Sequence, residues 1–281
     1  MTYRTASFVH EGHRLTYDLY DATGDDGPLF VYLHGLLLDS GINRGIAEAL
    51  ADRGHRVALL DLLGHGRSDA PLHAAEYRID TYADQVFALL DELGERSAVL
   101  GGLSLGANVS LFAASRHPER VAGLVLEMPG LERAVPSAAL IFAPMLLAAH
   151  YAKPLVGVVG AALRRLPASP WASLDSLLGA ARMPVDQLAS VLHGVLVGPV
   201  APTQDARARL TVPTLVLAHR RDLIHPFDDA RALADLMPNA TLVRARSPLE
   251  LRVRPERLTL EVDDFLDRLG SPGRARRSRG S

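Results

Sequence analysis

The amino-acid sequence predicts an α/β fold with a mostly parallel central sheet, flanked by helices and interrupted by an inserted helical cap. Continuously apolar short runs, typical of strands covered on both faces, alternate with segments of helical period. One stretch, from about residue 128 to residue 205, breaks this alternation and contains no convincing strand. Alternation of strands and helices indicates parallel strands joined by right-handed crossovers.

The elements follow in order along the chain. Two short strands are expected around the turn at Glu11 and Gly12. The apolar runs that predict central strands lie at 29–33, 57–60, 98–100, 121–126 and 214–218. Amphipathic helices are predicted at 41–53, 81–93, 105–116, 228–236 and 255–269. The last of these begins with Pro255, a residue well suited to a first helical turn.

These elements place a core domain in residues 1–127 and 206–270, with the cap in residues 128–205. Between Val135 and Leu163 the only residues that can carry charge are His150 and Lys153. A membrane-spanning helix needs about 20 uninterrupted apolar residues. Prolines and glycines are expected to divide the apolar stretch into shorter pieces (Pro136, Pro144, Pro154, Gly157 and Gly160). We therefore expect no stable membrane insertion.

Composition excludes several kinds of site. The 281 residues include no cysteine, which rules out disulfides, a thiol nucleophile and thiolate-bound zinc. There is no HExxH motif, no P-loop and no GxGxxG after the first central strand. The sequence thus predicts neither a metal nor a cofactor.

Charge is nearly balanced, with 30 basic against 32 acidic residues. Four of the arginines lie in the tail 271–281, which we expect to be disordered, and the body without them carries a net charge of −6. A nucleic-acid partner is therefore not expected. The first residues contain no apolar segment of the signal-peptide kind, which predicts a cytoplasmic protein.

The sharpest chemical signal is Gly102-Leu103-Ser104-Leu105-Gly106, between a predicted strand and a predicted helix. Such a tight turn forces Ser104 into a strained conformation and presents its hydroxyl at a helix N-terminus. Small residues are needed at 102 and 106, because side chains there would clash. Ser104 is therefore the candidate nucleophile.

Two more loops follow strand ends on the same side of the sheet. Leu33-His34-Gly35-Leu36 ends the first central strand, and Asp61-Leu62-Leu63-Gly64-His65-Gly66-Arg67-Ser68-Asp69 ends the next. The backbone N–H groups of Leu36 and Leu105 can point to one place and form an oxyanion hole. One such donor contributes about 2.7–4 kcal/mol to transition-state stabilisation.

Together with a late aspartate after Thr214–Ala218, these motifs resemble the α/β-hydrolase superfamily over about residues 10–130 and 205–270. The resemblance implies that Ser104 is the nucleophile, that Leu36 and Leu105 hold the oxyanion and that Asp222 is the triad acid. It gives the loop after Asp61 a mainly structural role.

One feature departs from this family. The catalytic histidine usually follows the last strand, but the sequence has no histidine after His225. His225, three residues past Asp222, is the preferred candidate base. His193, in the apolar cap segment, is an alternative base that could reach the site from above. His34, beside the oxyanion turn, either bonds the backbone or binds a water or substrate there. Both are also candidate substrate contacts.

The acid is also open between two residues. Asp222 follows the strand at 214–218, whereas Glu127 ends the strand at 121–126, where some family members carry the acid. Glu127 otherwise lies at the substrate site or closes the first turn of the cap.

The predicted function is hydrolysis of a carboxylic ester, or a related acyl transfer, on an apolar small molecule. The apolar substrate follows from a cap that offers mostly aliphatic surface. Because the usual histidine is missing, two alternatives remain open. One is a lyase, cyclase or isomerase that uses only the oxyanion hole, and the other is an inactive protein that binds a lipophilic ligand.

Overall fold

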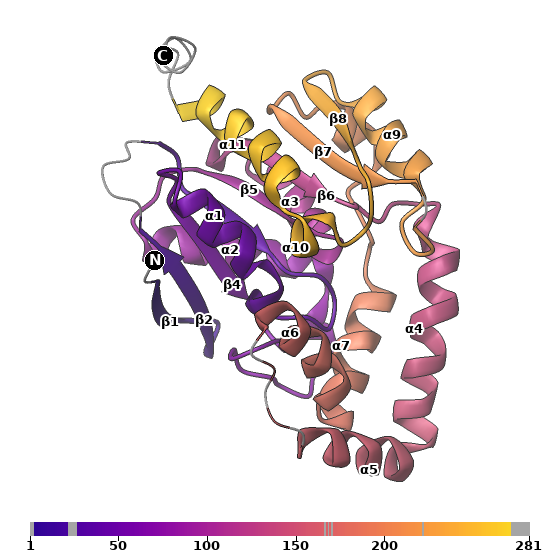
Figure 1. Cartoon of the computed structure of the whole chain (residues 1–281). Coiled ribbons are helices and arrows are strands. Elements are labelled where there is room, and N and C mark those ends of the chain that lie inside the picture. Colours follow the sequence, from indigo (N-terminus) through magenta and orange to yellow (C-terminus); the bar gives the residue numbers. More distant parts are fainter. Residues whose placement is uncertain are drawn as a thin grey trace.

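The computed structural model describes residues 3–21, 27–165, 167, 169, 171–220 and 222–270. The basic tail at 271–281 lies outside these residues. An eight-stranded sheet in the order β1-β2-β4-β3-β5-β6-β7-β8 forms the centre of the molecule (Figure 1). Its strands are β1 (Arg4–His10), β2 (His13–Tyr20), β3 (Phe30–Leu33), β4 (Val57–Asp61), β5 (Ala98–Leu103), β6 (Val121–Glu127), β7 (Thr214–His219) and β8 (Ala240–Ala245).

Strands β1 and β2 form an antiparallel hairpin, and β2 pairs antiparallel with β4. The pairs from β4 to β8 are parallel. In this register Leu33 lies opposite Gly102, and Leu103 lies opposite Glu127. Because parallel strands end at the same edge, the loops after β3, β5 and β6 meet there.

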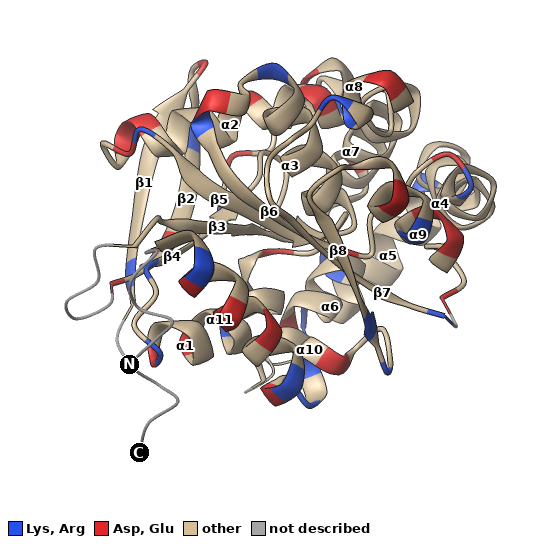
Figure 2. Cartoon of the chain, turned by 90° about the horizontal axis from the view of Figure 1, so that it is seen from above, with Lys and Arg blue, Asp and Glu red and all other residues tan. Residues whose placement is uncertain are grey.

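Helices cover both faces of the sheet, as the view from above shows (Figure 2). Helices α1 (Arg44–Ala51), α10 (Glu250–Val253) and α11 (Glu256–Gly270) lie on one face, and α2 (Ile79–Glu92) and α3 (Leu105–Arg116) on the other. In β3, Phe30 and Tyr32 pack against the face covered by α1 and α11, and Val31 and Leu33 pack against the face covered by α2 and α3. This two-sided burial explains why the central strands read as unbroken apolar runs.

The remaining core elements are short or peripheral. Helix α9 (Phe227–Leu236) precedes the edge strand β8. Single 3-10 turns occur at η1 (Ser40–Asn43), η2 (Ala74–Tyr77) and η3 (Pro118–Arg120). The sequence analysis did not single out β8 or α10 as elements, because β8 is only half-buried and α10 is four residues long.

The segment between β6 and β7 contains helices and no strand among its described residues. They are α4 (Ala134–Tyr151), α5 (Lys153–Arg164), α6 (Ala172–Arg182), α7 (Val185–Val197) and α8 (Gln204–Ala208). Figure 1 shows α4 and α5 standing out from the sheet. Helix α6 lies against the core, where Ser176 Oγ accepts a hydrogen bond from the Asp39 N–H (3.0 Å). The cap joins the core through Asn108, whose Nδ2 donates to the carbonyls of Gly130 and Val200.

Pro144 does not divide the apolar stretch as the sequence analysis expected, because it lies inside the continuous 18-residue helix α4. A proline in a helix removes one hydrogen bond, here the bond to the carbonyl of Leu140. Leu140 is exposed, so water can satisfy that carbonyl. The helical run breaks only at Ala152, between α4 and α5.

Two buried histidines hold the loop after β4. His34 Nε2 accepts a hydrogen bond from the Leu62 N–H (3.1 Å), and His65 Nδ1 donates to the Leu63 carbonyl (3.0 Å). Burial lowers the pKa of both rings, to about 3 for His65, where the neighbouring His34 acts in the same direction. Both rings are therefore neutral in the folded protein at neutral pH.

These lowered pKa values predict loss of stability in acid. Below the unfolded pKa of about 6.5, the unfolded chain binds protons that the folded chain excludes, so the free energy of unfolding falls as pH drops toward 3. The variant His65→Asn should flatten this slope by up to about 1.4 kcal/mol per pH unit. Urea unfolding at several pH values measures it. The exposed control His193→Asn should keep the wild-type slope, and equal slopes for all three proteins would contradict the argument.

Candidate active site

Ser104 lies at the sharp turn between β5 and α3. Its backbone has φ 51° and ψ −106°, a positive φ that is rare for a residue with a side chain. The Ser104 N–H donates to the Glu127 carbonyl (2.8 Å), and the Ser104 carbonyl accepts from the Asn108 N–H (3.1 Å). These bonds hold the strained conformation and aim the hydroxyl away from the sheet.

The two glycines of the turn permit this geometry. A Cβ at Gly102 would lie 2.7 Å from the backbone of Gly106 and from the Leu33 carbonyl oxygen. A Cβ at Gly106 would lie 2.7 Å from the Leu33 carbonyl oxygen and from Leu33 Cβ. The steric requirement inferred from the sequence is thus present in the coordinates.

A histidine reaches Ser104 from the loop after β7. His225 Nε2 lies 2.7 Å from Ser104 Oγ, and His225 Nδ1 lies 3.1 Å from Asp222 Oδ2. This pairing requires Nδ1 to donate to the carboxylate, which leaves Nε2 to accept from the hydroxyl. The structure therefore brings together Ser104, His225 and Asp222 in the order that nucleophilic catalysis uses.

Asp222 is held by a local turn. Its Oδ1 accepts hydrogen bonds from the N–H groups of Ile224 (2.8 Å) and His225 (3.0 Å). Burial by itself would raise the pKa of the carboxyl, but the side chain and backbone of His225 together with the Ile224 N–H lower it to about 2. Asp222 is therefore ionised at neutral pH and can stabilise a positive imidazolium.

The two proposed oxyanion donors lie beside Ser104. Leu36 and Leu105 both line the cavity that contains Ser104 and His225. Leu105 is the first residue of α3, where backbone N–H groups have no partner within the helix. Among the described residues, neither N–H is engaged in a hydrogen bond. Both are available to an incoming oxygen.

The cavity above Ser104 has a volume of about 230 Å³ and is almost entirely apolar. Helix α4 supplies one wall, including Ala138, Ala139 and Phe142. The polar side chains in the lining are those of Ser104, Asn108 and His225. Asn108, which the sequence analysis missed, follows Ser104 by one helical turn, and that spacing was the available signal.

Three candidates from the sequence lie away from this cavity. His193 is exposed on α7, and His34 is fully buried with both ring nitrogens bonded to backbone. Glu127 is buried, forms an ion pair with Arg252 and accepts from the Tyr32 hydroxyl (2.6 Å). None of the three lines the cavity, so the expected substrate contacts are not found. The carboxylate that contacts His225 is that of Asp222, whereas the carboxylate of Glu127 contacts Tyr32 and Arg252.

Arg252 occupies α10, in the stretch where the family histidine was expected. Besides Glu127, it donates to Asn43 Oδ1 (2.7 Å), and Asn43 in turn donates to the Leu33 carbonyl (3.1 Å). Arg252 thus links the end of β6, which bonds Ser104, to the end of β3, which starts the oxyanion turn. The only hint of this link in the sequence is the position of Glu127 at the end of a buried strand.

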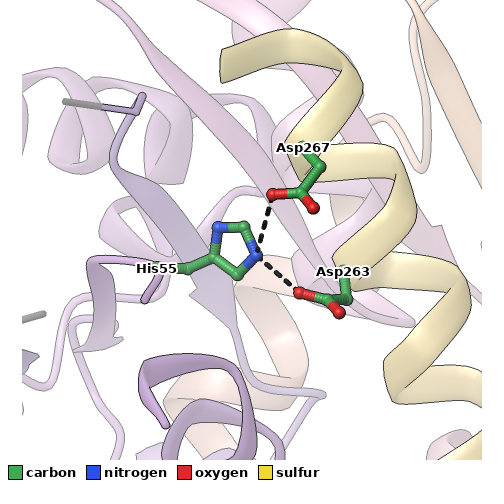
Figure 3. Close-up of side chains that lie close together, drawn as sticks. All are labelled: His55, Asp263 and Asp267. Atoms are coloured by element: carbon green, nitrogen blue, oxygen red, sulfur yellow. Dashed lines mark hydrogen bonds and ion pairs between the residues drawn. The ribbon is translucent and has the colours of Figure 1, made fainter. Parts of the chain in front are cut away.

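One further polar cluster lies at a distance from the cavity, between the start of β4 and α11 (Figure 3). His55 Nε2 lies 2.8 Å from Asp263 Oδ1 and 3.9 Å from Asp267 Oδ1. Arg53 Nε lies 3.5 Å from Asp263 and already offsets its charge. These contacts tie α11 to the sheet as ion pairs, and we assign the cluster that structural role.

Residues 28–247 match the family described as the alpha/beta hydrolase fold. The chain belongs to this family. A putative carbamate hydrolase RutD from Pseudomonas savastanoi pv. phaseolicola is 32% identical over 83% of this chain and 88% of its own length. An sn-1-specific diacylglycerol lipase ABHD11 from Danio rerio is 37% identical over 44% of this chain and 37% of its own. These relatives support a hydrolase.

Solved structures agree on the fold of this α/β hydrolase. The enol-lactonase from Burkholderia xenovorans LB400 superposes with a TM-score of 0.75 at 22% identity, covering 93% of this chain and all of that one. A hydrolase from Pseudomonas aeruginosa PA01 gives a TM-score of 0.72 at 26% identity, covering 93% and 98%. The predicted fold class is therefore confirmed.

The turn geometry predicts that Gly106→Ala destabilises this α/β hydrolase by about 1–3 kcal/mol, because the new methyl group overlaps Leu33 backbone and Cβ. The matched control is Gly45→Ala in α1, where a Cβ meets open space and alanine favours the helix. Urea denaturation compares the three proteins. Equal free energies of unfolding for Gly106→Ala and wild type would contradict the steric argument.

Proposed function

We propose that the chain hydrolyses a carboxylic ester of an apolar small molecule, or transfers its acyl group, with Ser104 as nucleophile. The observation that carries the proposal is the chain of hydrogen bonds from Ser104 through His225 to Asp222 under an apolar cavity. The alternatives without hydrolysis depended on a missing base. His225 at 2.7 Å from the hydroxyl removes that reason for preferring them.

In the proposed mechanism Ser104 Oγ attacks the acyl carbon while His225 Nε2 accepts the hydroxyl proton. Asp222 holds the ring in the required tautomer and stabilises the imidazolium. The developing oxyanion accepts hydrogen bonds from the Leu36 and Leu105 N–H groups, and the positive end of the α3 dipole adds to this stabilisation.

The tetrahedral intermediate collapses when His225 gives the proton to the leaving alkoxide. The acyl group is then bound to Ser104 Oγ as an ester. A water molecule, deprotonated by His225, attacks the acyl carbon, and the proton returns to Ser104 as the acid leaves. Another alcohol in place of water gives acyl transfer by the same steps.

The cavity supports an apolar substrate. Around Ser104 the lining from α4 consists of alanine, valine and phenylalanine, so a charged group there would lose hydration without a partner. The volume of about 230 Å³ accommodates a short aliphatic or aromatic group. The carbamate hydrolase among the relatives is a reason to include an apolar carbamate beside esters in any substrate panel.

The proposed roles predict that Ser104→Ala and His225→Ala each lower kcat/KM by a factor on the order of 10⁴ or more, since triad members act as a unit. Asp222→Asn should lower it by on the order of 10³–10⁴ through loss of the correct tautomer. The assay follows hydrolysis of short p-nitrophenyl esters by the full chain. Wild type should also gain the mass of one fluorophosphonate at Ser104.

The matched histidine control is His193→Ala, which changes an exposed residue outside the cavity and should keep wild-type turnover. Folded His225→Ala with undiminished turnover would overturn the assignment of the base. Folded wild type that neither reacts with the fluorophosphonate nor cleaves any ester or carbamate of the panel would overturn the proposed function.

A second prediction concerns the α4 wall of the cavity. Ala139→Phe adds a ring in the space above Ser104, so kcat/KM should fall at least tenfold for a hexanoate ester and much less for an acetate ester. The control Ala148→Phe changes a residue of the same helix outside the lining. The measurement is the ratio of kcat/KM for the hexanoate ester to kcat/KM for the acetate ester. A ratio in Ala139→Phe equal to that of wild type would mean that the acyl group does not bind beside α4.

A further inference from the structure

Helix α4 is apolar along its whole length but hardly buried. It is the one helix of the described ranges that is long and apolar enough to cross a membrane, with a mean hydropathy of 1.5 and 11% of its residues buried. Leu140 and Tyr151 are 78% and 81% exposed, and Leu147 lies between them on the same helical side. Soluble proteins rarely expose such a continuous apolar surface without a partner for it.

The apolar surface continues past the corner at Ala152. On α5 the exposed residues Leu155, Val158 and Val159 follow a helical spacing of three and four, so they share one side. We define the cap-tip surface as the large apolar residues of both helices that are more than half exposed: Leu140, Leu147, Tyr151, Leu155, Val158 and Val159. Figure 1 shows that α4 and α5 form the part of the cap farthest from β1 and β2.

The helices that carry the cap-tip surface contribute only positive formal charges. Residues 134–174 contain one lysine and two arginines and no aspartate or glutamate, in a chain of net charge −2. Lys153 is paired with Asp186 (2.5 Å). Arg164 and Arg165, at the end of α5, make no ion pair with any described residue. An apolar surface edged by unpaired arginines is complementary to a lipid surface with anionic headgroups.

A second copy of the chain fits this surface less well. In a two-fold dimer the same patch faces itself, so the two arginines of each copy would meet no acidic side chain from helices α4 and α5. Anionic headgroups provide the missing charge, and exposed Tyr151 is of the type enriched at the boundary between lipid and water.

We propose that the cap-tip surface docks the enzyme on an anionic lipid bilayer. The docking is peripheral, because another side of α4 (Ala138, Ala139 and Phe142) lines the cavity above Ser104 and would lose those contacts if α4 crossed the bilayer. The same helix then lies between lipid and cavity. The inference that the substrate is an apolar acyl ester taken from the lipid rests on the proposed function. The inference that the surface docks on a bilayer does not.

The experiment is flotation of the full chain with two kinds of vesicle. One contains phosphatidylcholine alone, and the other equal parts of phosphatidylcholine and phosphatidylglycerol. We expect binding to the mixed vesicles and much less to the neutral ones. Val158→Glu should weaken binding at least tenfold, and Arg164→Gln with Arg165→Gln should weaken it about five-fold for each cation removed.

The matched control is Val9→Glu on β1, which makes the same change at a residue 72% exposed, against 68% for Val158. This variant should float like wild type. Neither residue lines the cavity, so hydrolysis of a dissolved short ester by each variant reports that it is folded. Ser104→Ala should float like wild type, which separates failure of docking from failure of the proposed chemistry.

Three flotation results would each overturn the proposal. They are no binding of wild type to mixed vesicles, equal binding to both kinds of vesicle, and undiminished binding of Val158→Glu. A dimer in sedimentation that Val158→Glu dissociates would assign the surface to a second copy and would also overturn it.

Discussion

The backbone of Ser104 is the constraint on which the rest of the site depends. Its turn packs against Leu33 because residues 102 and 106 are glycines, since a Cβ at either position would lie 2.7 Å from neighbouring backbone atoms. The Glu127 carbonyl accepts the Ser104 N–H and holds the positive φ. The strain in such a conformation is of the order of 1–3 kcal/mol. The surrounding sheet sustains it, and this is why β3, β5 and β6 must end at one edge in the observed register.

The proposed base and the proposed acid, His225 and Asp222, come from a single turn after β7. Asp222 Oδ1 caps the N–H groups of Ile224 and His225 while its Oδ2 faces the ring, so one carboxylate fixes both the backbone and the tautomer. The distance between acid and base therefore depends on local backbone geometry. The distance from the His225 ring to Ser104, by contrast, depends on how the sheet places β5 and β7 side by side with β6 between them.

Much of the fold was predictable from sequence because buried parallel strands leave unbroken apolar runs and amphipathic helices leave a period. Strand β8 escaped because Arg244 and other half-exposed residues give an edge strand no such run. Of the candidate site, the turn at Ser104 was predictable from its glycines. His225 rather than His193 contacts Ser104 because of their distances in space, which no local sequence pattern encodes. Pro144 was expected to divide the apolar stretch, but it lies inside the continuous helix α4.

Arg252 lies in the stretch where the resemblance places a histidine, and its contacts there are structural. In the stretch after the last strand it reaches the buried carboxylate of Glu127 and, through Asn43, the carbonyl of Leu33. Removing either partner would leave an uncompensated charge in the interior, so loss of Arg252 or of Glu127 alone should destabilise the fold. Glu127 at the end of β6 and Arg252 after β8 thus connect the strand ends that carry Ser104 and the proposed oxyanion turn. His225 leaves both free for that role.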